Sequence, residues 1–317
     1  MAPIPYPTDR LRTWTWGDHR IGWIAGGKEH RGHSAVVLLH GFGACKEHWR
    51  QNLPVLARRR PTYALDLLGF GASSKPRATL IGEESSPGSV RYCMDLWADQ
   101  VLAFLDHEEL PSVQLVGNSI GGVVALTCAR KLEQLGRPAR QVVLIDCAQR
   151  ALDDKRLASQ PLLARWVRPL LKTVVRQRWI TGPLFRTLAS PGMIRKVLAV
   201  AYPSGRNIDD QLVDLLLQPA RDPQAPEAFR GFINLFDDRL APDLLADLIT
   251  PVRLIWGEDD PWEPVAEARR WLAFSSVKDI AVIPGLGHCP HDEDPERINT
   301  ILEALLEEGD PCPGSHS

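Results

Sequence analysis

The sequence predicts an α/β fold, in which a mostly parallel, doubly wound sheet carries helices on both faces and a separate helical cap. Short apolar runs rich in β-branched residues recur along the chain, with helix-like stretches between them. Nearly continuous hydrophobicity is typical of strands buried on both faces, and alternation with helices favours a parallel sheet. This alternation of strand-like and helix-like segments is interrupted over residues 148–249, and the interruption predicts the cap.

The strands follow in order from the N-terminus. Residues 14–25 read as two strands around a Gly-Asp turn. Further strands are expected at residues 35–39, 62–65, 113–116, 141–145, 252–256 and 279–283. Helices are expected at 92–106 and 123–135.

The domain organisation follows from this pattern. Residues 1–147 and 250–306 are predicted to form the core, and the proline-interrupted block 148–249 is the cap, inserted after the sixth strand. Residues 307–317, which end in DPCPGSHS, are predicted to be a disordered tail.

Composition excludes several classes of protein. The chain has 317 residues, a net charge of −2 and 44% hydrophobic content, which is ordinary for a soluble globular protein and gives no sign of nucleic-acid binding. No apolar run of about 18 residues could span a bilayer, and no secretory signal is evident, so a cytoplasmic location is expected. The six cysteines are scattered and are expected to be reduced, without a metal site. No cofactor is expected.

A nucleophile is predicted in the stretch LVGNSIGG. Gly117 and Gly121 flank Ser119 in the pattern G-x-S-x-G, directly after an apolar run and before a helix-like segment. Such a strand–turn–helix elbow exposes the serine hydroxyl above the sheet. The alternative is an ordinary glycine turn.

A serine nucleophile needs a base and a carboxylate that orients the base. The candidates, Asp260 and His288, each follow an expected strand, and the chain order Ser, Asp, His is that of the α/β-hydrolase pattern. The alternatives to Asp260 are Glu258 and Asp259 beside it and Asp146 at the end of the 141–145 run. His291 is the alternative base.

The segment His40-Gly41-Phe42-Gly43 follows the 35–39 run. We expect the backbone amides of Phe42 and Ile120 to form an oxyanion hole. The turn that begins at Asp66 is expected to be architectural. Residues expected to line the substrate site are His40, Gly41, Gly43, Asn118 and Trp262.

These motifs resemble the α/β-hydrolase superfamily. The matching segments are HGFG (40–43), DLLGFGAS (66–73), GNSIGG (117–122), WGEDDPWEP (256–264) and GLGHCPHDEDPE (285–296). The elbow, the DPWEP segment, the GHCPHDEDPE ending and the basic cap resemble the pheophytinase and chlorophyll-dephytylase branch, which hydrolyses the phytyl ester of chlorophyll-type pigments. The resemblance implies an α/β-hydrolase fold and a Ser119–His288–Asp260 triad. The elbow lacks the nucleophilic aspartate of haloalkane dehalogenases and epoxide hydrolases.

The expected function is therefore hydrolysis of a lipophilic carboxylic ester through an acyl-enzyme. Two alternatives stay open: a related hydrolase acting on small esters, thioesters or carbon–carbon bonds, and a non-catalytic member that only binds a ligand.

The cap is unusually basic. Residues 155–208 contain eleven lysines and arginines and no acid. Apolar residues recur at helical spacing within it, at Leu162, Leu163, Trp166, Val167, Leu170, Leu171, Val174 and Val175. This stripe either packs onto the sheet domain over the site or contacts a lipophilic substrate or a membrane surface, as basic amphipathic helices do.

Overall fold

The computed structural model describes residues 11–30, 32–150, 153–159 and 172–310. Its strands are β1 (Arg12–Trp16), β2 (His19–Gly26), β3 (Ala35–Leu39), β4 (Thr62–Leu65), β5 (Val113–Asn118), β6 (Gln141–Ile145), β7 (Val252–Gly257) and β8 (Val277–Ile283). They form one sheet in the order β1-β2-β4-β3-β5-β6-β7-β8. β1–β2 and β2–β4 pair antiparallel, and the later pairs are parallel. The predicted mostly parallel sheet is confirmed.

The helices lie between the strands, as the alternating pattern predicts. They are α1 (Leu53–Leu56), α2 (Met94–His107), α3 (Ile120–Gln134), α5 (Arg178–Leu188), α6 (Pro191–Ala201), α7 (Asp210–Ala220), α8 (Ala225–Ile233), α9 (Ala241–Leu245), α10 (Val265–Arg270), α11 (Pro290–Glu293) and α12 (Pro295–Glu308), with the 3-10 helices η2 (Lys46–Trp49), η3 (Asp154–Ser159) and η4 (Trp271–Ala273). α3 begins earlier than the predicted residue 123, directly after Ser119, because the elbow leads straight into the helix.

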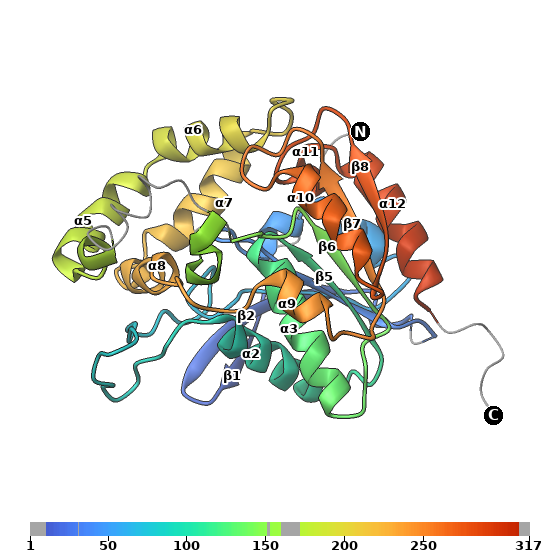
Figure 1. Cartoon of the computed structure of the whole chain (residues 1–317), viewed down its shortest axis with the longest axis horizontal. Helices are drawn as coiled ribbons and strands as arrows, with labels where there is room; N and C mark the ends of the chain where they lie inside the picture. Colours follow the sequence, from blue (N-terminus) through green and yellow to red (C-terminus); the bar gives the residue numbers. More distant parts are fainter. Residues whose placement is uncertain (1–10, 31, 151–152, 160–171, 311–317) are drawn as a thin grey trace.

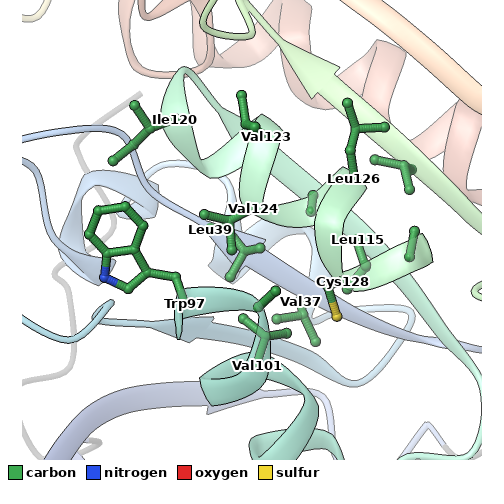
Figure 2. Packing of buried hydrophobic residues seen from close by; sticks show 14 of the residues in the cluster. Val37, Leu39, Trp97, Val101, Leu115, Ile120, Val123, Val124, Leu126 and Cys128 are labelled. Carbon is green, nitrogen blue, oxygen red and sulfur yellow. The ribbon is translucent and has the colours of Figure 1, made fainter. Parts of the chain in front are cut away.

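Each face of the sheet has its own core. Val37 and Leu39 of β3 pack with α2, α3 and α9 on one face, and Val36 and Leu38 pack with α1 and α12 on the other. Figure 1 shows this layering, and Figure 2 shows side chains of α2 and α3 converging on β3 and β5. Burial of each such aliphatic side chain stabilises the fold by roughly 1.5–3 kcal/mol. The two cores fix the strand ends, and with them the site.

Helices α5 to α8 form the cap beyond one edge of this layered core (Figure 1). The described residues of 148–249 contain no strand, as expected. Ala241 and Leu245 of α9, near the end of that range, pack in the core against α3. No helix in the described part of the chain has the length and apolar character needed to cross a bilayer.

The C-terminal tail differs from the expectation. α12 continues to Glu308, and the Asp310 carboxylate accepts hydrogen bonds from the Ser34 amide at 3.0 Å and from Arg60 at 2.8 Å. These contacts tie residues 307–310 to the folded core, so that stretch is not a disordered tail. Residues 311–317 lie outside the described part of the chain.

Candidate active site

Three predicted residues lie at the carboxyl edge of the sheet. Ser119 follows β5, Asp260 lies just beyond β7 and His288 lies beyond β8. β5 to β8 are successive parallel neighbours in the sheet, so their carboxyl ends lie at one edge. The fold therefore brings together residues that are up to 169 positions apart in the chain.

Ser119 occupies a strained backbone conformation, with φ 54° and ψ −122°. The turn can form because its neighbours lack side chains: a Cβ on Gly117 would lie 2.3 Å from the Gly121 carbonyl oxygen, and one on Gly121 would lie 2.4 Å from that of Leu39. Strain of this kind persists only where the surrounding structure enforces it. The predicted elbow is thus present, with Ser119 at the N-terminus of α3.

The candidate acid, Asp260, and the candidate base, His288, are in direct contact. His288 Nδ1 lies 2.8 Å from Asp260 Oδ2. The other carboxylate oxygen, Oδ1, accepts from the Trp262 amide at 2.9 Å and the Glu263 amide at 3.1 Å. With Asp260 held in this way and its bond to His288 formed through Nδ1, the Nε2 atom is the ring nitrogen left for chemistry.

The loop that carries His288 is anchored from three sides. The His288 amide donates to the Ala201 carbonyl of the cap at 2.9 Å. Asn118 Nδ2 donates to the His288 carbonyl at 3.0 Å, and the Gly287 amide donates to Glu293 at 2.8 Å. The Trp262 ring also meets the His288 ring edge to face, with centroids 4.8 Å apart.

Two backbone amides are available beside Ser119. Phe42 and Ile120 both line the same cavity as Ser119 and His288. Among the described residues, neither amide N–H donates to a backbone or side-chain acceptor, although buried amides are normally paired. Their unused donors are what an oxyanion hole requires.

The structure places the alternative candidates elsewhere. His291 is fully buried, contacts the Trp49 ring at 4.4 Å, and burial holds its pKa well below the usual value. Glu258 and Asp259 are exposed loop residues. Asp146 is fully buried, and its Oδ1 accepts from the Gly257 amide, whereas the carboxylate bonded to His288 is that of Asp260.

His40 does not line the cavity, contrary to the expectation. Its Nδ1 lies 2.8 Å from the Gly41 carbonyl oxygen, and its Nε2 accepts from the Leu67 amide at 3.0 Å. Both ring nitrogens are therefore used to join two loops, and the ring is fully buried. The other residues expected to line the site, Gly41, Gly43, Asn118 and Trp262, do line the cavity.

The turn at Asp66 has the architecture expected of it. The fully buried carboxylate accepts from the Lys46 amide at 2.7 Å, from Lys46 Nζ at 2.8 Å and from the Ala72 amide at 2.8 Å. A Cβ on Gly71 would lie 2.0 Å from this carboxylate, so the turn closes tightly around it. Asp66 thus fixes two loops next to the site rather than reaching into it.

Sequence reasoning missed several ionisable residues of the cavity wall: His48, Arg150, Tyr202 and Glu263. Glu263 lies nearest to Asp260 in the sequence. Its Oε2 accepts from the Gln149 amide at 2.8 Å. Burial raises the pKa of Glu263 from 4.5 to about 7, with His288 and Asp260 among the charges that act on it. The sequence places Glu263 in the DPWEP segment, three residues after Asp260, but only the fold shows that its side chain is partly buried in the cavity wall.

The cavity itself has a volume of about 580 Å³ and lies between the sheet edge and the cap. Each of α5, α6, α7 and α8 contributes to its wall. The apolar lining from the cap consists of Phe185, Leu188, Met193, Ile194, Val197, Leu198, Leu216, Phe229 and Phe232. The Phe232 ring stacks on Phe42 with centroids 3.8 Å apart, which joins the cap to the loop at residues 40–43. Such a site suits an apolar ligand with one reactive polar group.

Comparison with known proteins agrees with the fold. Residues 36–301 match the alpha/beta hydrolase family. The chain is 27% identical to the uncharacterized hydrolase YugF of Bacillus subtilis, over 87% of this chain and 90% of that protein. It is 25% identical to the chloroplastic pheophytinase of Arabidopsis thaliana, over 90% of this chain and 64% of that protein. The crystal structure of a membrane phospholipase A superposes with a TM-score of 0.70 at 23% identity, covering 94% of this chain and 86% of that one.

Proposed function

The chain belongs to the alpha/beta hydrolase family, and from this premise we propose that it is a serine hydrolase that cleaves carboxylic esters through an acyl-enzyme. One observation carries the proposal. Ser119, His288 and the unused amides of Phe42 and Ile120 face a single cavity, with Asp260 bonded to the histidine behind it.

The reaction follows from this arrangement. Ser119 Oγ forms a bond to the ester carbonyl carbon while His288 Nε2 takes its proton. The Phe42 and Ile120 amides donate to the oxyanion. The carbonyl carbon–alkoxy bond then breaks, and His288 gives its proton to the leaving alcohol oxygen. Water repeats the two steps on the acyl-enzyme, which releases the acid and returns the proton to Ser119. Asp260 stabilises the cationic form of His288.

We propose that the substrate is a lipophilic ester, such as the phytyl ester of a chlorophyll-type pigment. Support comes from the apolar walls that four cap helices supply, since an apolar chain gains roughly 0.8 kcal/mol for each buried CH₂ group. The likeness to the Arabidopsis pheophytinase is the second support.

Release of free phytol from pheophytin a and chlorophyll a tests the substrate. Wild type is expected to release phytol and Ser119→Ala is not. A panel of p-nitrophenyl esters of increasing chain length serves as the comparison. Turnover of the short esters alone would contradict the phytyl assignment and leave the ester hydrolase reaction standing.

We also propose that the outer surface of the cap contacts membranes peripherally. Most of the predicted apolar stripe, residues 162–171, lies outside the described residues, and its last two residues, Val174 and Val175, precede α5. The support therefore comes from α5 and α6. Large apolar side chains on these helices face solvent: Trp179, Leu184 and Val200. The exposed cations Arg186 and Lys196 lie on the same two helices, and each basic group near an anionic lipid surface contributes about 1 kcal/mol.

The membrane contact is tested by co-sedimentation with vesicles of phosphatidylserine and phosphatidylcholine at low salt. We expect wild type to sediment, and the double variant Trp179→Ser/Leu184→Ser to remain in solution. Ile249→Ser is the matched control, since Ile249 is 76% exposed but follows α9 in the core. Equal sedimentation of the cap variant and the control would contradict the assignment of the surface.

A further inference from the structure

A second carboxyl group, that of Asp146, lies behind the acid of the site. Asp146 directly follows β6, is fully buried and has a positive φ of 43°, which is uncommon for a residue with a side chain. Its amide donates to the Ile255 carbonyl at 3.0 Å, and its Oδ1 accepts from the Gly257 amide at 2.9 Å. Both contacts are to β7, so the side chain is fixed toward the strand that leads to Asp260.

The remaining oxygen of this carboxyl group has no donor. Among the described residues, Asp146 Oδ2 is buried without a hydrogen-bond donor. Asp260 is tied to the same residue of β7, because its amide donates to the Gly257 carbonyl at 3.3 Å while the Gly257 amide donates to Asp146 Oδ1. Two ionised carboxylates in contact in a buried place repel strongly, and such a pair is held together by one proton.

The number of hydrogen-bond donors to each carboxyl group decides whether Asp146 or Asp260 carries that proton. Asp260 accepts from the Trp262 and Glu263 amides and from the His288 ring, and all three contacts stabilise its ionised form. Asp146 accepts only from the Gly257 amide among the described residues. A proton on Asp146 Oδ2 also turns the unpaired acceptor into a donor aimed at Asp260.

We propose that Asp146 is a neutral carboxylic acid that donates a hydrogen bond to Asp260, and is thereby a positioning residue for the His288–Asp260 pair. The proposal rests on the proposed function, in which Asp260 orients the catalytic base. Asp146 itself touches neither substrate nor His288. It holds the Asp260 carboxylate from the β6 side while the two loop amides hold it from the other.

The surroundings agree with a neutral Asp146. Burial, followed by the charge of Asp260, raises the pKa of Asp146 well above its usual value. Glu263 is the other ionisable acid that acts on it. The nearby thiols Cys147 and Cys289 are uncharged, because burial raises the pKa of each well above the usual value.

If Asp146 is a neutral donor, the variants Asp146→Asn and Asp146→Ala should differ in activity. Asp146→Asn keeps an acceptor for the Gly257 amide and a donor for Asp260, and it can never ionise. Its kcat/KM and its pH profile are expected to match those of wild type within about twofold. Asp146→Ala removes the donor, so Asp260 becomes more basic and holds the imidazolium more tightly. We expect kcat to fall on the order of tenfold, with the acidic limb of the kcat/KM profile displaced to higher pH.

Infrared spectroscopy tests the proton without relying on activity. At pH 8, where Glu263 is largely ionised, the wild-type minus Asp146→Asn difference spectrum should contain the C=O stretch of a protonated carboxyl group. Absence of that band, or a loss of kcat/KM in Asp146→Asn equal to that in Asp146→Ala, would overturn the proposal. If wild type hydrolyses no ester, the proposed function fails, while the infrared result still decides the state of the carboxyl pair.

Discussion

The side-chain amide of Asn118 donates to the main-chain carbonyl of His288 at 3.0 Å, and to that of Ile145 at 3.2 Å. Asn118 is the last residue of β5 and immediately precedes Ser119. One amide group thus joins the strand that carries the nucleophile to the loop that carries the base. The distance between these two groups is therefore set by the fold and not by the substrate.

Replacement of Asn118 by Ala is expected to lower kcat/KM by on the order of 10- to 100-fold, because the His288 loop loses its fixed register with Ser119. Gln114→Ala is a matched control: Gln114 lies in the same strand and donates a buried amide bond to the Leu306 carbonyl, at the opposite end of β5. Both variants lose stability, by roughly 1–3 kcal/mol. Steady-state ester hydrolysis separates them, and equal losses of activity would contradict a positioning role for Asn118.

The buried ion pair of Asp66 and Lys46 should matter for stability rather than for chemistry. Asp66→Ala leaves the Lys46 ammonium, whose side chain is 2% exposed, with Glu47 alone. We expect a loss of free energy of unfolding on the order of 3 kcal/mol in urea. Asp99→Ala, which breaks the exposed pair with Lys131, is expected to cost less than about 1 kcal/mol. Similar losses of free energy of unfolding in the two variants would show that the turn does not depend on the buried ion pair.

Glu263 predicts a pH dependence of stability. Burial raises the pKa of Glu263 in the folded protein from 4.5 to about 7. The contribution of Glu263 to the free energy of unfolding is therefore fully present below pH 4.5 and is lost as the pH rises through 7. The loss is on the order of 3 kcal/mol. Glu263→Gln should therefore gain stability relative to wild type as the pH increases from 4.5 to 8, in urea unfolding at each pH. A difference that does not change with pH would sink this assignment.

The cap cavity predicts a dependence on the length of the substrate. Ala189 lines the cavity at the end of α5, and Ala199 lies exposed on α6. Ala189→Trp is expected to fill the space and lower kcat/KM for long-chain esters by at least about tenfold, with short esters affected little. Ala199→Trp should leave both unchanged. An equal loss of kcat/KM for esters of all chain lengths in Ala189→Trp would contradict binding of the long substrate chain beside Ala189.

The positions of the strand ends could be predicted from the sequence, because each candidate residue follows an apolar run that only a buried strand explains. The contact of His288 with Asp260 follows once β7 and β8 are known to be neighbours. The proposed hydrogen bond from Asp146 to Asp260 does not follow in the same way. It depends on the conformation of Asp146, whose φ of 43° directs the side chain toward β7.

Burial explains the remaining differences. His40 follows a strand and precedes a glycine, as a substrate-binding residue does, yet hydrogen bonds at both ring nitrogens turn it into the core. Glu263 resembles a solvated loop acid in the sequence, and only packing against the cavity changes its pKa. The shape of the cavity depends on how the four cap helices α5 to α8 pack relative to one another, and local sequence patterns do not predict that packing.

Labelling by a fluorophosphonate probe tests the central claim, that Ser119 is the nucleophile, most directly. Wild type is expected to gain one covalent adduct, located on the peptide that contains Ser119. Ser119→Ala should remain unlabelled, and Asp260→Asn should react much more slowly, because His288 loses its charged partner. An unlabelled wild type, or equal labelling of wild type and Ser119→Ala, would contradict the account.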